Sequence, residues 1–174
     1  VQKEGYSDIE KADVNYDFMQ SSLYGFAQPE NKVVNGNYVL KLDNIPDNEL
    51  PNVTIVTPTY NRHKMFSLAI KNFMDFNYPK NKMKWIIIDD SDDDGVEDLI
   101  DKSDKRIEYV DLRELKKRVT IGQKRNIGAD MAKTDYILHM DDDDYYPAES
   151  ILARVKLLIK YKDTIGCVGS SEVG

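Results

Sequence analysis

The feature that most constrains the fold is an alternation of apolar strands and amphipathic helices that begins at Val53. Residues 53–57 (VTIVT) are β-branched throughout, which is typical of a strand buried on both faces. Apolar residues over 66–74 then recur at i, i+3, i+4, i+7 and i+8, the spacing of an amphipathic helix. From this point onward, strand-like and helix-like segments alternate along the chain.

The same patterns predict the remaining elements. Strands are expected at 85–88, 107–110, 136–140 and 165–168. Helices are expected at 122–132 and from a first turn at Pro147 onward, the second with an apolar face over 151–159. This order indicates an α/β domain with a mainly parallel sheet. Ligands bind beyond the carboxyl ends of such strands. The segments 58–62, 89–95 and 141–144 are therefore the places to look for chemistry.

Residues 1–50 have a different character, because they are polar and only weakly periodic. An Asn35-Gly36 pair flanked by apolar residues predicts a small hairpin. Pro46 and Pro51 bracket an acidic stretch. We therefore expect an N-terminal extension and linker over 1–50, followed by the α/β domain over 51–174.

The charge balance limits the partners. Lys and Arg number 24 against 31 Asp and Glu, a formal net charge of −7. This argues against nucleic acid and anionic membranes, which demand clustered cations. A bound metal ion still allows an acidic protein to bind a phosphorylated substrate.

Two absences bear on the compartment. Cys167 is the single cysteine, so no intramolecular disulfide is possible, which fits a reducing compartment. No run of eighteen apolar residues occurs, so we expect no membrane span in this chain. We interpret the location as cytoplasmic, or on the cytoplasmic side of a membrane.

Four consecutive aspartates, at 141–144, directly follow the apolar strand 136–140. Adjacent carboxylates repel one another, so they need solvent or a cation, and oxygen ligands favour Mg²⁺ or Mn²⁺. The alternative is a solvated acidic loop. The apolar strand before the run and Tyr145-Tyr146-Pro147 after it favour a metal site.

A second acidic patch follows the strand at 85–88. Asp89 and Asp90 stand at the strand end, where a carboxylate commonly accepts hydrogen bonds from a ribose or a base. The alternative is an Asp-rich turn. The segment TPTYNR at 57–62 has neither a Gly-x-Gly-x-x-Gly nor a Walker A pattern, but Tyr60 can stack on a base and Arg62 can meet a phosphate.

The segment GQKRNIG at 122–128 places Lys124, Arg125 and Asn126 at the start of a helix. Helix N-termini attract anions, and the two cations would add to the attraction for a diphosphate. A solvated helix face is the alternative.

These motifs occur together in one order: VTIVTPTYNR at 53–62, IIIDDS at 86–91, GQKRNIG at 122–128 and YILHMDDDDYYP at 136–147. In this arrangement, residues 53–161 resemble glycosyltransferase family 2. The resemblance implies the GT-A fold, a Rossmann-like three-layer sandwich. It covers about 110 residues and leaves the first fifty unexplained.

The resemblance also implies roles for residues in nucleotide binding. Tyr60 would lie against the nucleobase, Thr57 and Pro58 would form the pocket wall, and Asp90 would bond the base, usually uracil. Others would lie near the nucleotide: Arg62, Asp89, Lys124, Arg125 and Asn126.

For the acidic run, the resemblance implies an Asp-x-Asp motif at Asp141-x-Asp143. The first carboxylate would serve the ribose or the metal, and the later one the metal. Because four aspartates are adjacent, the register is ambiguous by one. Asp142 therefore remains a nucleotide-binding candidate and Asp144 a metal-binding candidate.

The expected activity is metal-dependent transfer of a sugar, with inversion, from a nucleoside-diphosphate sugar (UDP-linked) to an unknown glycan, protein or lipid acceptor. Mn²⁺ or Mg²⁺ would stabilise the leaving diphosphate. The resemblance places the catalytic base beyond Gly174, so this fragment is expected to be incomplete. A nucleotidyltransferase, a non-catalytic nucleotide-sugar-binding module and a generic α/β domain with acidic loops remain the alternatives.

Overall fold

A computed structural model describes residues 32–34, 37–39, 44–92, 94–115, 117–163 and 166. The chain divides into two compact units, Val1–Leu42 and Asp43–Gly174. In the first unit, strands β1 (Lys32–Val34) and β2 (Asn37–Val39) pair antiparallel, with Val34 opposite Asn37. The hairpin predicted around Asn35-Gly36 is confirmed by this pairing.

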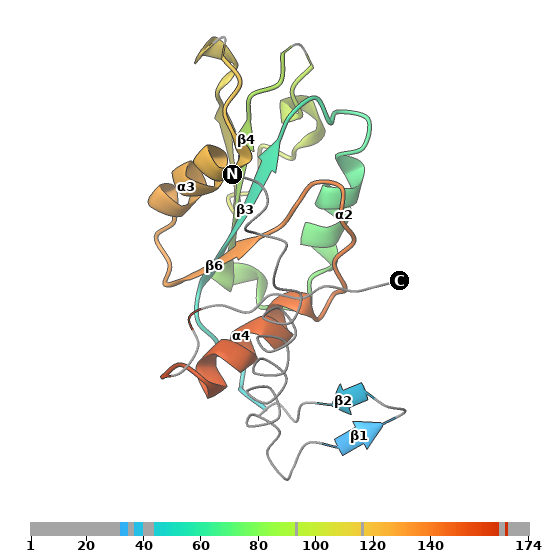
Figure 1. Cartoon of the computed structure of the whole chain (residues 1–174), viewed down its shortest axis with the longest axis vertical. Coiled ribbons are helices and arrows are strands. Elements are labelled where there is room, and N and C mark those ends of the chain that lie inside the picture. The colour runs from blue at the N-terminus through green and yellow to red at the C-terminus, as the bar shows by residue number, and fades with distance from the viewer. Residues whose placement is uncertain are drawn as a thin grey trace, which may run out of the picture. The chain divides into compact units, whose positions relative to one another are not determined.

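In the described part of the second unit, four strands form one sheet in the order β5-β4-β3-β6. They are β3 (Val53–Thr59), β4 (Met83–Asp89), β5 (Ile107–Asp111) and β6 (Tyr136–His139). Neighbouring strands all pair in parallel. Their carboxyl ends therefore lie on the same edge of the sheet, as the alternation of elements predicts (Figure 1).

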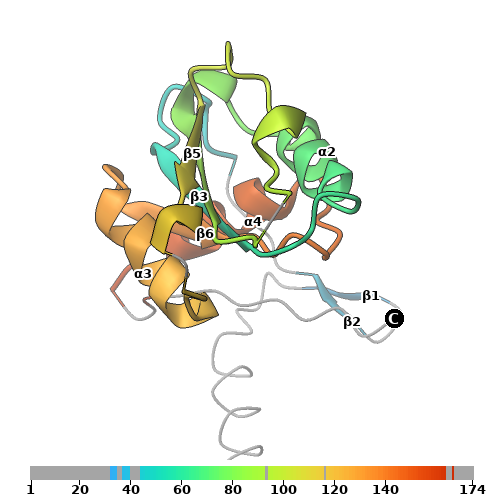
Figure 2. The same cartoon turned by 90° about the horizontal axis from the view of Figure 1, so that it is seen from above.

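Helices lie on both faces of this sheet. Helix α3 (Ile121–Met131) covers one face, and helices α2 (Ser67–Asp75) and α4 (Ser150–Lys160) lie on the other (Figures 1 and 2). Three short 3₁₀ helices complete the described elements: η1 (Lys80–Lys82), η2 (Glu97–Leu99) and η3 (Arg113–Leu115). The result is the predicted three-layer α/β sandwich.

The start of α4 differs from the prediction. Pro147 lies in the turn before the helix, where its carbonyl accepts a hydrogen bond from Ser150 N–H. The preceding backbone is tied to α2, because Asn72 bonds both Asp144 O and Tyr146 N–H. These contacts hold the segment out of helical geometry, so α4 begins later. The strand predicted at 165–168 lies outside the described residues.

The main core lies between the sheet and α2. Trp85 of β4 stacks on Phe66 and Phe73, with ring centroids 5.8 and 4.8 Å apart. Its indole N–H donates to Thr57 Oγ1 at 2.9 Å, so its polar atom is satisfied although the side chain is fully buried. Each aromatic pair adds about 0.5–1.5 kcal/mol beyond the area it buries. This cluster packs α2 against the sheet.

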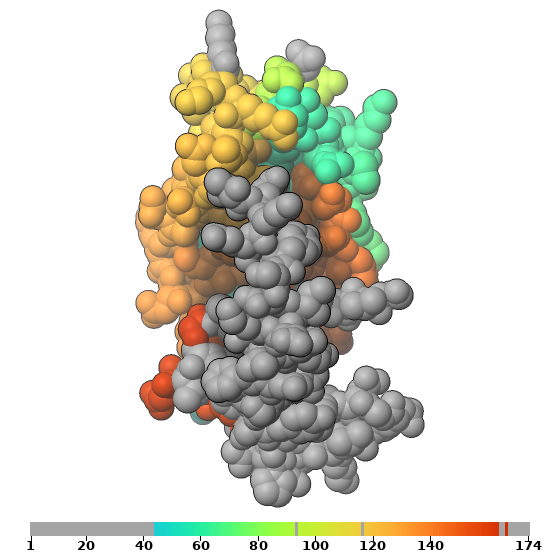
Figure 3. Space-filling view, viewed as in Figure 1, coloured from blue at the N-terminus to red at the C-terminus, as the bar shows by residue number. Residues whose placement is uncertain are grey.

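On the other face, α3 approaches β3 at a glycine. A Cβ placed on Gly128 would collide with the Val56 side chain, whereas Gly122, in the first turn, has no neighbour within 4 Å of such an atom. The helix comes this close only because Gly128 has no side chain. In Figure 3, α3 and its flanking loops (yellow to orange) form one flank of the visible face. The contact determines where the start of α3 lies relative to the end of β3.

We predict that Gly128→Ala lowers the free energy of unfolding by about 1–3 kcal/mol, because the added methyl overpacks the Val56 contact. Urea unfolding measures this change. Gly122→Ala is the matched control and should cause no loss, since alanine is favoured over glycine in a helix. Equal stability of Gly128→Ala and the wild type would show that α3 does not depend on this close approach.

Candidate functional site

A cleft of about 710 Å³ opens at the carboxyl ends of β3 and β6. This volume lies within the range of about 300–1,000 Å³ that is usual for small-molecule sites. Three segments line it: residues 58–62 at the end of β3 and in the loop after it, residues 118–121 with 124 and 125 before and at the start of α3, and residues 141–143 after β6. The parallel sheet thus brings together most of the segments that the sequence singles out.

The loop after β3 is held to the loop after β4 by Asn61. This residue has a φ of 53°, a left-handed conformation that Asn tolerates better than most residues. Its N–H donates to Ser91 Oγ at 2.8 Å, and its side-chain oxygen accepts from Asp92 N–H at 2.9 Å. Sequence reasoning did not single out Asn61. The loop carrying Tyr60 and Arg62 is fixed by these bonds.

Tyr60 lies at one side of the cleft. Its hydroxyl donates to Asp92 Oδ2 at 2.5 Å, and this bond raises the pKa of the phenol. The guanidinium carbon of Arg118 lies 4.1 Å from the ring centroid, and Lys124 Nζ lies 5.6 Å from it. The ring is therefore anchored by its hydroxyl and has two cations beside it.

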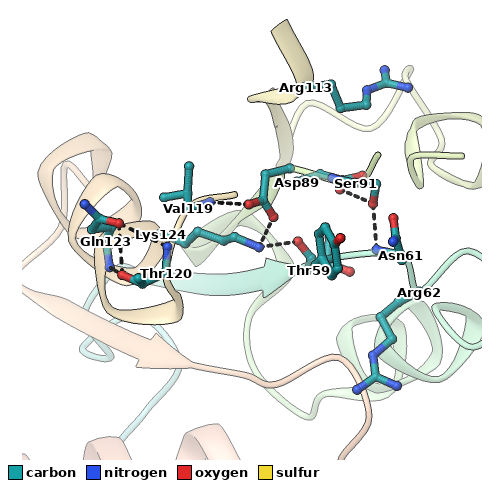
Figure 4. A network of polar contacts seen from close by, with 12 residues as sticks. Thr59, Asn61, Arg62, Asp89, Ser91, Arg113, Val119, Thr120, Gln123 and Lys124 are labelled. Atoms are coloured by element: carbon teal, nitrogen blue, oxygen red, sulfur yellow. Dashed lines mark hydrogen bonds and ion pairs between the residues drawn. The ribbon is translucent and has the colours of Figure 1, made fainter. Parts of the chain in front are cut away.

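A buried ion pair joins Lys124 to Asp90. The two side chains are 3% and 1% exposed. Lys124 Nζ also donates to Thr59 O at 2.6 Å, and the second Asp90 oxygen accepts from Val119 N–H at 2.5 Å. Figure 4 shows Lys124 reaching from the start of α3 to Thr59. The pair connects the end of β3, the end of β4 and the loop before α3.

Asp89 and Thr57, both predicted to bind the nucleotide, are buried away from the cleft. Asp89 is fully buried and accepts hydrogen bonds from Ser91 N–H and Oγ–H, Val96 N–H and Tyr109 O–H. Thr57 is fully buried beneath Trp85. Neither lines the cleft, and neither does Asp90. In this arrangement these side chains shape the loops that form the cleft walls.

Asn126, which was also predicted to lie near the nucleotide, is exposed on α3 and does not line the cleft.

The aspartates of the acidic run differ in exposure, and three of them, Asp141, Asp142 and Asp143, line the cleft. Asp141 and Asp143 line the cleft, with side chains 41% and 44% exposed. Between them, Asp142 is buried and accepts from Thr59 Oγ1 at 2.6 Å; burial raises the pKa of its carboxyl group. Asp144 is exposed, lies outside the lining, and its carbonyl accepts from Asn72. Asp141 and Asp143 are therefore the pair that shows exposed carboxylates to the cleft.

Arginines neutralise these two carboxylates. Arg125 donates to Asp141 at 2.7 Å and Arg62 donates to Asp143 at 3.0 Å. Within the described ranges, no group of three or more His, Cys, Asp and Glu side chains is arranged to hold a metal ion. Two exposed carboxylates on one cleft nevertheless fit Mg²⁺ or Mn²⁺, which usually bind one or two carboxylates and complete their shell with substrate phosphates and water.

Comparison with known proteins identifies the family. The model of glycosyl transferase family 2 matches residues 54–173, more than half of the chain. The chain belongs to glycosyl transferase family 2. The resemblance predicted from the four ordered motifs is confirmed.

Two curated relatives illustrate the similarity. Poly(ribitol-phosphate) beta-glucosyltransferase of Bacillus spizizenii is 30% identical over 103 residues, which are 58% of this chain and 16% of that protein. Poly(ribitol-phosphate) beta-N-acetylglucosaminyltransferase TarS of Staphylococcus aureus is 21% identical over 98 residues, 56% of this chain and 17% of TarS. The family 2 chain described here thus spans less than a fifth of either relative.

Solved structures support the fold. The crystal structure of S. aureus TarS 1–349 matches 64% of this chain and 33% of that structure, with a TM-score of 0.56 and 19% identity. Mannosyltransferase PcManGT of Pyrobaculum calidifontis, in complex with GDP-Man and Mn²⁺, matches 68% of this chain and 36% of that structure, with a TM-score of 0.56 and 22% identity. The predicted GT-A fold is confirmed.

Other features of the described residues bear on the predictions. The sequence did not point to Arg118, because nothing distinguishes it from a solvated arginine. Thr120, which caps α3 by accepting from Gln123 N–H while the Gln123 side chain accepts from Thr120 N–H, was detectable as a Thr-x-x-Gln capping box. Within the described ranges, no helix is both long enough and apolar enough to cross a bilayer.

We predict that Lys124→Met lowers the free energy of unfolding by about 3–5 kcal/mol, because it leaves the Asp90 carboxylate buried without a counter-charge. Urea unfolding checks this, and adding Asp90→Leu to the same chain should recover much of the loss. Lys71→Met is the matched control: the exposed Lys71–Asp75 pair should contribute less than about 1 kcal/mol. Similar losses for the two lysines would contradict a special role for the buried pair.

Proposed function

We propose that this chain is the donor-binding part of a glycosyltransferase that uses a nucleoside-diphosphate sugar, UDP-linked, together with Mn²⁺ or Mg²⁺, and transfers the sugar with inversion. The observation that carries the proposal is the difference in exposure among the three aspartates that line the cleft. Asp141 and Asp143 present exposed carboxylates to a cleft that also contains an aromatic ring and cations, while Asp142 is buried and accepts a hydrogen bond from Thr59.

In the proposed complex, the nucleobase lies against Tyr60. The ring is held by the Tyr60–Asp92 hydrogen bond, so a stacked base would meet a surface that is already ordered. Asp90 contributes through the protein, because its carboxylate holds Lys124 and the Val119 N–H in the adjacent wall. Pro58 lines the same part of the cleft.

The diphosphate lies between the base and the acidic run. Asp141 and Asp143 would hold the metal ion, which neutralises charge on the leaving diphosphate as a Lewis acid. Arg62 and Arg125 lie within hydrogen-bonding distance of these carboxylates. Once a cation takes over the carboxylates, the guanidinium groups are free to donate to phosphate oxygens, which arginine binds well.

The relatives support this class of donor. A TarS structure contains UDP-GlcNAc and the PcManGT structure contains GDP-Man with Mn²⁺. Both ligands are nucleoside-diphosphate sugars, and they differ in the base. A cleft that holds the base mainly by stacking on Tyr60 is compatible with either base, because every base has a π-face.

Calorimetric titration of this chain with UDP and with GDP, with and without Mn²⁺, tests the proposal. We expect UDP to bind, and Mn²⁺ to strengthen its binding. Binding of GDP alone would support the donor class and contradict the UDP-linked donor. Asp143→Asn should weaken the Mn²⁺-dependent part by about tenfold or more, since even residues that only support a metal ligand contribute 10–100-fold.

Asp144→Asn provides the matched control, because Asp144 is an exposed neighbour in the same run but lies outside the cleft lining. It should leave the effect of Mn²⁺ unchanged. The reverse result, with Asp144 required and Asp143 dispensable, would shift the register by one residue. Binding of neither nucleotide to the wild-type chain would refute the proposed function.

A further inference from the structure

Arg118 occupies a place in the cleft that no motif assigns to it. The side chain belongs to the irregular segment before α3, is exposed, and lines the cleft. Its guanidinium carbon lies 4.1 Å from the centroid of the Tyr60 ring. Stacked aromatic rings have centroids roughly 4.5–7 Å apart, so Arg118 stands as close to Tyr60 as a stacked base would.

The two cations beside Tyr60 differ in how strongly their partners hold them in place. Lys124 is fixed, because it is buried in the pair with Asp90 and donates to Thr59 O. Arg118 interacts electrostatically with Asp92, the partner of the Tyr60 hydroxyl, but no ion pair within 4 Å joins it to a carboxylate of the described residues. Its contact with the ring is a cation–π interaction, which is weak at exposed sites. A base that stacks on the ring would therefore displace Arg118 and leave Lys124 in place.

The charges of the cleft indicate where Arg118 would go. The other cations that line the cleft each pair with a carboxylate: Arg62 with Asp143, Lys124 with Asp90, and Arg125 with Asp141. A nucleoside diphosphate brings several negative charges. Among the described residues that line the cleft, Arg118 is the cation that can bind them without breaking an existing ion pair. Arginine also suits phosphate geometrically, because its planar group donates two parallel hydrogen bonds.

We infer that Arg118 is a nucleotide-binding residue that covers the Tyr60 ring when the cleft is free and donates to the diphosphate when a base takes its place on the ring. This inference rests on the proposed function and adds to it a residue for the phosphates that is independent of the acidic run. Exchanging a weak ring contact for charge-assisted hydrogen bonds favours the bound arrangement.

Comparison of a nucleotide with its nucleoside tests the inference. UDP and uridine, or GDP and guanosine if GDP is the nucleotide that binds, are titrated in the calorimeter into the wild type and Arg118→Ala. We expect Arg118→Ala to lower the affinity for the nucleoside diphosphate by about tenfold, because the variant loses hydrogen bonds between charged groups. Affinity for the nucleoside should stay unchanged or rise, because the variant clears the Tyr60 ring.

Two further variants sharpen the result. Arg118→Lys keeps the charge without the planar group, so it should retain most of the diphosphate affinity that Arg118→Ala loses. Lys117→Ala removes the neighbouring exposed cation, which does not line the cleft, and should leave both affinities unchanged. Thermal unfolding of each variant should match the wild type, because both side chains are exposed.

Three results would overturn the inference. Equal weakening of nucleotide and nucleoside by Arg118→Ala would mean that the guanidinium holds the base. An unchanged nucleotide affinity would mean that Arg118 takes no part in binding. An equal loss of nucleotide affinity in Lys117→Ala would mean that the effect comes from the positive charge of this segment and not from a specific contact of Arg118. In all three cases the wild-type chain still binds the nucleotide, so the proposed function stands. A wild type that binds no nucleoside diphosphate refutes both.

Discussion

The site depends first on the buried ion pair between Lys124 and Asp90. Removing two charges from water is unfavourable unless each meets its partner in good geometry with further hydrogen bonds. Here that condition requires three segments to meet, because Lys124 also binds Thr59 O and Asp90 also binds the Val119 N–H. The pair therefore ties α3 to the ends of β3 and β4. The same contact brings Lys124 beside Tyr60 and sets the wall from which Arg118 extends.

The acidic composition of the chain gives a poor description of this cleft. A formal charge of −7 indicates repulsion of anions, yet Arg62, Arg118, Lys124 and Arg125 all line the cleft. Most of these cations are neutralised locally by aspartates, so the site is close to charge balance before a ligand arrives. A divalent cation on Asp141 and Asp143 would change that balance, because the arginines paired with them would then be available to donate to a phosphate. Net charge averages over the whole chain and cannot report such an arrangement.

Local patterns predicted most of the fold correctly. The β-branched run at 53–57 and the apolar run at 85–88 became the central strands β3 and β4, because a strand covered on both faces is apolar along most of its length. The start of α4 was predicted too early, at Pro147. The reason lies elsewhere in the chain: Asn72 bonds the backbone at 144 and 146 and holds it out of the helix. A local propensity cannot register a hydrogen bond from a residue more than seventy positions away.

The sequence by itself determined the order of the elements, the family and most of the segments that meet at the cleft, since each depends on residues adjacent in the chain. Residues 89–95, also expected there, do not line the cleft, whereas residues 118–121 do. Tertiary structure decided which side chains face the cleft. Asp142 is buried against Thr59, a contact across 83 residues, whereas Asp141 and Asp143 are exposed. The carboxylates of Asp89 and Asp90 bond buried partners, while the Arg118 guanidinium lies over the Tyr60 ring. Burial and pairing are properties of residues that meet in space, so four identical aspartates in a row acquire different roles only after folding.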